Sequence, residues 1–224
     1  IQAREDFVAA FAHELKTPLT SIIGYADALR SRRLDEEKQF MSANYIYTEG
    51  KRLEAMSFRL LDIMVTRRGE VEFTMVSAES LFLYLYDMYV INKSMKIYFN
   101  YDDGMVRAEA NLIKSVLMNL LDNAFKASEA DGLIEVYGHL MKDGYCFEVK
   151  DHGVGIPKEE LHKITKAFYM VDKSRSRSRN GAGLGLALCA EILELHKSRL
   201  NIRSELGKGT TMSFTLPLWK EDQL

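Results

Sequence analysis

The sequence predicts an α+β protein in which a helical hairpin precedes an α/β sandwich, with one mixed sheet backed by helices. Two observations lead to this fold class. Apolar residues recur every three or four positions up to residue 66, whereas short alternating runs typical of strands mix with helical runs beyond residue 70. The 224 residues, 47% hydrophobic and 28% charged, have the composition of a soluble globular protein. A formal net charge of −2 argues against nucleic acid as a partner.

The first 66 residues are predicted to form two long helices joined by a polar turn at 31–37. Pro18 falls inside the first helix and should bend it, because proline removes a helical hydrogen bond. The second helix carries a heptad-like stripe made of Phe40, Ala43, Tyr47, Gly50, Leu53, Ser57, Leu60 and Met64. One hairpin cannot bury so wide a stripe, so we expect a homodimer whose two hairpins form a four-helix bundle.

The helical pattern breaks at 67–70, which we interpret as a linker between domains at 1–66 and 71–224. The second domain is predicted to contain strands at 71–76, 96–101, 133–141, 145–150, 199–204 and 210–216. Its helices are predicted at 80–90, 111–128 and 183–196. A basic, serine-rich loop is expected at 173–179.

Asn119 and Asn123 are the first candidate site residues of the second domain. They lie four positions apart, so they share one face of a helix that is otherwise apolar. Neutral amide oxygens bind a hard cation such as Mg²⁺ without cancelling the charge that phosphates supply. Buried amides need partners, which favours this role over an ordinary polar helix surface.

Asp151 follows a predicted strand and precedes Gly153 and Gly155. A carboxylate accepts a hydrogen bond from the exocyclic amine of adenine, which would select adenine over guanine. The glycines would let the backbone approach a flat ring. An ordinary turn is the alternative, since Asp and Gly are common turn residues.

A glycine-rich run, 181–185, precedes the last predicted helix. Such loops at helix N-termini present amide hydrogens to phosphate. A dinucleotide-binding fold does not fit, because no strand precedes the run and Leu186 stands where a third glycine is needed. Lys173 and Arg175 in the preceding basic loop are candidate phosphate contacts, and a solvated loop is the alternative.

In order along the chain, these motifs resemble the catalytic core of the sensor histidine kinases of two-component systems. The segments that match the N, G1, F, G2 and G3 boxes of this family are 119–126, 151–155, Phe168, 181–185 and 207–211. The resemblance implies the ATP-binding fold shared with gyrase, heat-shock chaperone and mismatch-repair ATPases, with ATP and Mg²⁺ as cofactors.

The resemblance also implies roles for individual residues. Asn123 would hold Mg²⁺, Lys126 would meet phosphate, Asp151 would bind adenine, and Thr211 would support Asp151 through a water molecule. A mobile lid is expected at 166–182. The complete nucleotide site that we predict consists of Asn119, Asn123, Lys126, Asp151, Gly153, Gly155, Tyr169, Lys173, Arg175, Gly181, Gly183, Leu184, Gly185 and Thr211.

His13 lies in a segment, 13–19, that matches the H box of the same family. A neutral imidazole is a good nucleophile near neutral pH. The resemblance implies that His13 accepts the phosphoryl group from ATP, assisted by Glu14 as base, and passes it to an aspartate of a response regulator. Thr17, one helical turn away, would orient the water that dephosphorylates the regulator.

Two positions depart from the family pattern: Thr165, where many relatives carry a second aromatic residue, and Met170, where many carry an arginine. Two alternatives therefore stay open, a protein that acts mainly as a phosphatase and a dimeric scaffold with a degenerate ATP site. We expect this chain to be the cytoplasmic portion of a longer protein, with an upstream region as the only connection to the cell membrane.

Overall fold

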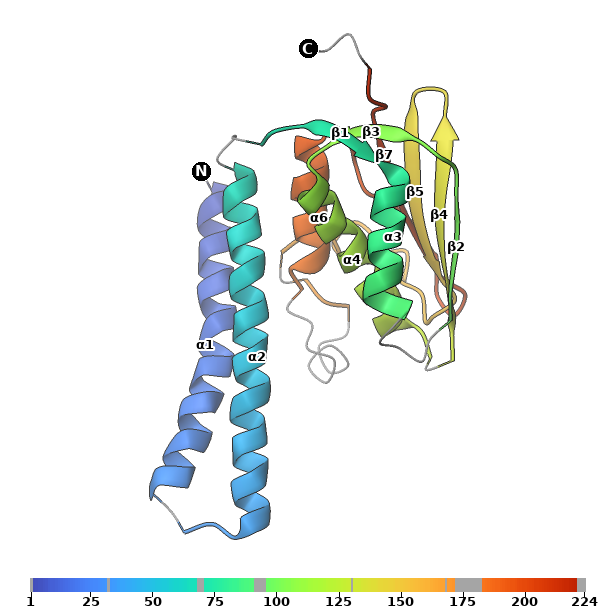
Figure 1. Cartoon of the computed structure of the whole chain (residues 1–224). Coiled ribbons are helices and arrows are strands. Elements are labelled where there is room, and N and C mark those ends of the chain that lie inside the picture. The colour runs from blue at the N-terminus through green and yellow to red at the C-terminus, as the bar shows by residue number, and fades with distance from the viewer. Residues whose placement is uncertain are drawn as a thin grey trace.

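A helical hairpin and an α/β sandwich make up the structure, a computed structural model (Figure 1). The described residues are 2–31, 33–67, 71–90, 96–129, 131–167, 169–171 and 183–220. Within them, the side chains that lie outside the description are those of residues 2–14, 51–52, 54–67 and 90. The expected α+β class is confirmed.

The hairpin consists of α1 (Gln2–Ser31) and α2 (Glu36–Arg67), which run antiparallel (Figure 1). The helical assignment of α1 continues through Pro18. Tyr25 of α1 and Tyr45 of α2 stack with ring centroids 4.7 Å apart, which ties the two helices together. No helix in the described ranges is both long enough and apolar enough to cross a bilayer.

The expected dimer stripe on α2 is largely open to solvent in the single chain. Phe40 is 74% exposed and Tyr47 66%, and Ile23 on α1 is 59% exposed. Large apolar side chains left open along a helix are typical of surfaces that another chain covers. The side chains of Ser57, Leu60 and Met64, which complete the predicted stripe, lie outside the described residues.

The main sheet has five strands in the order β2-β4-β5-β7-β6. Their bounds are β2 Lys96–Tyr101, β4 Leu133–Met141, β5 Gly144–Asp151, β6 Asn201–Glu205 and β7 Gly209–Leu216. The pair β2–β4 is parallel and the other pairs are antiparallel, so the predicted mixed sheet is confirmed.

A second, two-stranded sheet pairs β1 (Thr74–Ser77) with β3 (Met105–Ala108). The sequence analysis missed β3, a strand of only four residues. It also started β1 too early, at residue 71. Pairing begins only where Thr74 meets Ala108, because the partner strand ends there.

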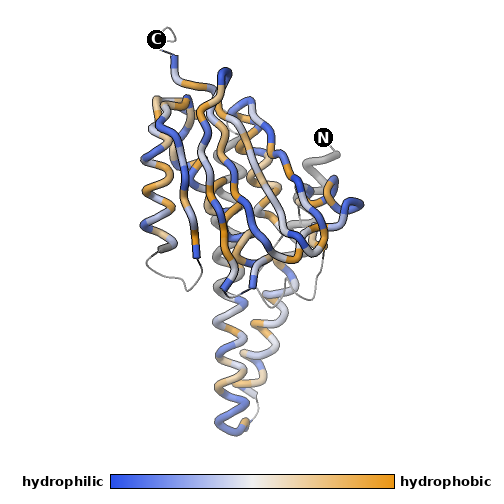
Figure 2. Tube along the Cα trace, turned by 90° about the vertical axis from the view of Figure 1, so that its right-hand side faces the viewer, coloured by the Kyte–Doolittle hydropathy of each residue, from blue (hydrophilic) through white to orange (hydrophobic). Residues whose placement is uncertain are grey.

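Three helices cover one face of the main sheet: α3 (Ala78–Val90), α4 (Ala110–Ala127) and α6 (Gly185–Leu195) (Figure 1). They begin and end within two residues of the predicted bounds. The core lies between this layer and the sheet, where alternate residues of β5, including Tyr145 and Phe147, are fully buried. Figure 2 shows the opposite face of the sheet, which none of the described helices covers.

A buried histidine fastens the helical layer at one end. His196, 3% exposed, lies just beyond α6, where its Nδ1 is 2.7 Å from the Ile192 carbonyl oxygen. Its Nε2 accepts a hydrogen bond of 3.1 Å from the amide of Glu109, the residue that caps α4. Together these bonds require a neutral ring with its hydrogen on Nδ1. Burial lowers the pKa of His196, in agreement with that state.

Stability should therefore depend on His196 below neutral pH. Because the folded pKa is lower than the ordinary value of 6.5, the stabilising effect is complete above pH 6.5. It is lost as the pH falls below that value, since the unfolded chain takes up the proton first. We expect the free energy of unfolding, measured with urea, to fall with pH in this range. A His196→Gln variant should lose that slope, and His139→Gln, changed on the exposed sheet face, should keep it.

Candidate functional site

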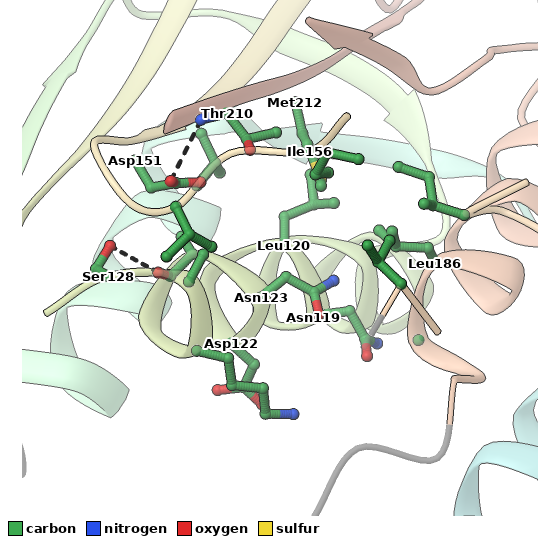
Figure 3. Close-up of a pocket in the computed structure, with 18 of the residues that line it drawn as sticks. Asn119, Leu120, Asp122, Asn123, Ser128, Asp151, Ile156, Leu186, Thr210 and Met212 are labelled. Carbon is green, nitrogen blue, oxygen red and sulfur yellow. Dashed lines mark hydrogen bonds between the residues drawn. The ribbon is translucent and has the colours of Figure 1, made fainter. Parts of the chain in front are cut away.

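A cavity of about 460 Å³ lies between α4, the loop after β5, residues 169–171, the start of α6 and β7 (Figure 3). This volume is in the range of small-molecule sites. The predicted site residues that line it are Asn119, Asn123, Lys126, Asp151, Gly155, Tyr169, Gly183 and Gly185. Residues from four separated segments, three of which are the N, G1 and G2 motifs, therefore meet at one place.

Helix α4 supplies the polar side of the cavity because its two faces differ. The Glu109 carboxylate caps the helix by accepting a 2.6 Å hydrogen bond from the Leu112 amide. Apolar residues then follow at helical spacing and are buried in the core: Leu112, Ile113, Val116, Leu117, Leu120, Leu121 and Ala124. With that stripe fixed in the core, Asn119 and Asn123 come to the cavity wall (Figure 3).

The two asparagines have different surroundings. The amide group of Asn119 donates a 2.9 Å hydrogen bond to the Ser115 carbonyl oxygen of its own helix. The Nδ2 of Asn123 is buried and has no hydrogen-bond partner among the described residues. Because buried polar groups are nearly always paired, an amide in this state beside a cavity indicates a place for a ligand.

Asp151 ends β5 and is 6% exposed. Its Oδ1 accepts hydrogen bonds from the amides of Gly153, at 2.8 Å, and Thr210, at 3.3 Å. Burial raises the pKa of Asp151, and these two bonds partly offset that shift. Both hydrogen bonds that the described residues make to this carboxylate use one oxygen, so the geometry favours the other, Oδ2, for a ligand.

The loop after Asp151 is clamped on both sides. The Val154 amide donates to the Ala127 carbonyl at the end of α4, and the Gly207 amide donates to the Val154 carbonyl. Gly155 has a φ of 68°, and a Cβ there would lie 2.1 Å from the Glu205 carbonyl oxygen. Glycine at 155 is thus required by both conformation and space.

Gly153 was expected to lie against a ligand ring, but it packs against the end of α4. It is absent from the cavity lining among the described residues, and a Cβ there would lie 2.3 Å from the Ala127 carbonyl oxygen. Its lack of a side chain lets the loop pack on the end of α4 and leaves its amide to bind Asp151. The expected approach to a ring therefore applies to Gly155, which does line the cavity.

The structure places Thr210, and not the predicted Thr211, beside Asp151. Asp151 pairs with Thr210 across β5 and β7, and the amide of Thr210 contacts the carboxylate (Figure 3). Successive side chains on a strand face opposite sides, so buried Thr210 lines the cavity and Thr211 belongs to the other face of the sheet. The strand alternation Thr210-Met212-Phe214 in the sequence could have identified the correct threonine.

Apolar side chains complete the cavity, and the sequence analysis did not select them. They come from five elements or loops: Leu120, Val149, Ile156, Ile164, Leu186 and Met212. Such walls suit a flat aromatic base placed beside a few polar groups. Val149 and Met212 could have been found from strand alternation, since they share a face with Asp151 and Thr210.

Residues 169–171 form the outer edge of the cavity. The hydroxyl of Tyr169 donates a hydrogen bond to Glu160, and the Lys163 ammonium lies 3.3 Å from the same carboxylate. Met170, which stands where many relatives carry an arginine, also lines the cavity. The predicted site residues Lys173, Arg175 and Gly181, together with Phe168, lie outside the described residues.

The start of α6 closes the remaining side. Gly183 has a φ of 66°, and the helix begins at Gly185. Leu184 is fully buried, so its side chain anchors this turn in the core and does not reach the cavity. The first amides of α6 have no carbonyl partner within the helix, which makes this end suitable for phosphate.

The predicted catalytic residues of the H box lie on α1, in the helical hairpin. His13 and Glu14 are within this helix, with side chains outside the described part, and Thr17 is exposed. Thr17 is not a cavity residue. The structure therefore brings the nucleotide motifs together and keeps the H-box motif on a separate element.

Two family models match the chain. Residues 108–220 match the histidine kinase-, DNA gyrase B- and HSP90-like ATPase family, which is more than half of the chain. Residues 3–64 match the His kinase A phospho-acceptor domain. This chain belongs to the histidine kinase family. Its cavity lies within the part that matches the ATPase model.

Relatives agree over almost the whole chain. It is 32% identical to the sensor histidine kinase WalK of Bacillus subtilis over 233 residues, covering 99% of this chain and 38% of WalK. It is 30% identical to the non-motile and phage-resistance protein of Caulobacter vibrioides over 240 residues, covering 99% of this chain and 28% of that protein. The chain thus spans well under half the length of these two relatives.

Solved histidine kinases share the fold. A complex of the histidine kinase ThkA with the response regulator protein TrrA matches with a TM-score of 0.76 at 24% identity, covering 97% of this chain and 63% of that one. The Acinetobacter baumannii histidine kinase AdeS matches with a TM-score of 0.69 at 18% identity, covering 93% of this chain and 98% of that one.

Replacing Asp151 with Asn tests the electrostatics of this site. Because burial raises the folded pKa above the ordinary 3.8, stability falls as the pH rises through that range, and the cost is complete at neutral pH. Asn keeps an oxygen for the Gly153 and Thr210 amides and removes the buried charge. We expect a thermal midpoint equal to or above that of the wild type at pH 7. A clear decrease, with no decrease in Asp143→Asn in an exposed turn, would contradict this account.

Proposed function

We propose that this chain is an ATP-dependent protein-histidine kinase that phosphorylates itself on His13 and passes the phosphoryl group to an aspartate of a response regulator. One observation carries the proposal: the N, G1 and G2 motifs converge on a single cavity in a chain that also matches the phospho-acceptor family. WalK supplies the context, since that whole protein is named as a sensor histidine kinase.

Adenine is proposed to enter the apolar part of the cavity, with its exocyclic amine on Asp151. Leu120, Ile156 and Met212 would enclose the ring faces, because removing the flat apolar surface of the ring from water is favourable in free energy. The carboxylate, held by two amides, offers an acceptor to the amine. Guanine carries an oxygen at this position and would be repelled.

The phosphates are proposed to extend from there toward α4 and the start of α6. Lys126 lines this side of the cavity and brings a positive charge, and the first amides of α6 bring partial positive charge. In the lid, we propose contacts to phosphate from Lys173, Arg175 and the glycines at 181, 183 and 185. The hydroxyl of Tyr169 is anchored to Glu160, which holds its ring at the edge of the cavity.

The asparagines of α4 fit a magnesium ion bound to phosphates. The described residues contain no cluster of three His, Cys, Asp or Glu side chains that could bind a metal. An ion that takes most of its ligands from phosphate and water needs only one or two protein oxygens. We propose Asn123 as its ligand, with Asn119 beside it. When bound, Mg²⁺ would neutralise phosphate charge.

In the transfer step, a nitrogen of His13 would form a bond to the γ-phosphorus as the bond from that phosphorus to the bridging oxygen of ADP breaks. Glu14 would accept the proton of the other ring nitrogen and stabilise the positive charge that develops on the ring. A second displacement would then move the phosphoryl group from His13 to a carboxylate oxygen of the regulator. Positioning and charge neutralisation are the main catalytic contributions.

The physiological unit is proposed to be a homodimer. Phe40, Tyr47 and Ile23 are open in the single chain, and burying such side chains against a second hairpin contributes on the order of 1.5–3 kcal/mol each. The same helices would dock a response regulator, in line with the complex known for ThkA. Domains at 1–66 and 71–224, with a linker at 67–70, suit this division of labour.

Phosphatase activity through Thr17 is proposed as a second activity of the same helix. Thr17 is exposed on α1, where it could orient water against a docked regulator. A degenerate scaffold is less favoured, because the cavity keeps Asn123, Asp151 and Gly155. We further propose that the chain works in the cytoplasm, as part of a protein anchored in the cell membrane.

Removing the Asn123 side chain should separate metal-dependent from metal-independent binding. We expect Asn123→Ala to lower ATP affinity on the order of tenfold when Mg²⁺ is present, since the loss of one charge-assisted contact has about this effect. In EDTA the variant and the wild type should bind alike. Titration calorimetry with ATP measures both, and Asn100→Ala on an exposed strand position is the control. Equal losses with and without Mg²⁺ would exclude the metal role.

Replacing His13 with Gln tests the proposed function directly. Incubation with γ-labelled ATP and Mg²⁺ should give acid-labile, alkali-stable label on the wild type and none on His13→Gln, whereas ATP affinity should not change. Asp151→Asn should lose the label as well, and its ATP affinity should fall about 10- to 100-fold, the effect of one hydrogen bond to a charged group. His139→Gln should behave as the wild type. Label that persists on His13→Gln would refute the assignment.

A further inference from the structure

Ser204 of β6 lies behind the proposed adenine site, outside every motif discussed above. Its Oγ receives a 2.8 Å hydrogen bond from the Ile156 amide and lies 2.9 Å from both the Gly209 carbonyl oxygen and the Thr210 hydroxyl. One hydroxyl therefore connects the end of the loop after Asp151 to the start of β7.

Proton counting fixes the direction of these bonds. The Gly209 carbonyl has no proton, so its contact uses the only proton of Ser204. The Ser204 oxygen then acts as acceptor for the Ile156 amide and for the Thr210 hydroxyl. It has used its donor and both of its lone pairs, and Thr210 has no proton left to offer.

This result has a consequence for the cavity. Thr210 is 4% exposed, lines the cavity and lies beside Asp151 (Figure 3). With its proton committed to Ser204, the hydroxyl presents only lone pairs toward a ligand, directly next to a carboxylate that also only accepts. A donor on the base, such as an exocyclic amine, is favoured there, and a carbonyl oxygen is not.

We propose that Ser204 is a positioning residue that sets base specificity: it holds the Thr210 hydroxyl as an acceptor and so favours 6-aminopurines over 6-oxopurines. The inference rests on the proposed function, because it assumes that a purine nucleotide occupies this cavity. Without Ser204, the Thr210 hydroxyl is free to turn and donate to a 6-oxo group, which reduces the discrimination.

The test compares ATP with inosine triphosphate, which differs at the 6-position, by calorimetry on the full chain. Ser204→Ala should lower the ratio of the two affinities about three- to tenfold, the effect of one net hydrogen bond. Ser204→Thr keeps the hydroxyl and should restore the wild-type ratio. Ser213→Ala, on the opposite face of the same strand pair, should leave the ratio unchanged.

The ratio separates specificity from stability. If Ser204 only supports the fold, both affinities fall by the same factor and the ratio stays constant, which would overturn the inference. An unchanged ratio with unchanged affinities would overturn it as well. A wild-type chain that binds neither nucleotide would overturn the proposed function, and this inference with it.

Discussion

The nucleotide site depends on one buried carboxylate. Asp151 sits at the end of a central strand, where removal from water makes its charge costly, and the amides of Gly153 and Thr210 offset part of that cost. Those amides belong to two different segments, so both must be in place for the charge to be tolerated. The glycines at 153, 155 and 209 follow from this requirement, because each permits a backbone contact too close for a side chain.

Helix α4 supplies the polar side chains of the cavity. Its apolar stripe is held in the core on one side, and this fixes the rotation of the helix so that Asn119 and Asn123 reach the cavity. The buried Nδ2 of Asn123, which has no hydrogen-bond partner among the described residues, reduces stability unless a ligand pairs with it. At Asn123, the side chain that suits ligand binding therefore lowers the stability of the fold. Leu120 contributes to both, because its side chain is buried in the core and also lines the cavity.

Regular periodicity made most of the fold predictable. The strands β2 and β4 and the helix α4 follow from runs long enough to show their period, while β3 is too short to show one. The meeting of Asp151 and Asn123 at one cavity was predictable, because both belong to motifs of a single family. It was not predictable where the choice depends on pairing across strands: Thr210, not its neighbour Thr211, faces Asp151. Ser204 could not be predicted from the sequence for the same reason, since its three hydrogen-bond partners come together only in the folded chain.

Each half of the chain has one feature that the proposed function explains. In the α/β half, the buried Nδ2 of Asn123 has no hydrogen-bond partner among the described residues, and it lies at the cavity where the proposed function puts a nucleotide. The hairpin leaves large apolar side chains open, and in the proposed dimer a second hairpin would cover them. Phosphoryl transfer under the proposed function must bring the hairpin and the α/β half together, because the acceptor and the nucleotide motifs lie on separate elements. A fixed contact between the halves would favour one step of the cycle only. The linker that we propose at 67–70 would therefore suit a protein in which His13 must meet first ATP and then the regulator.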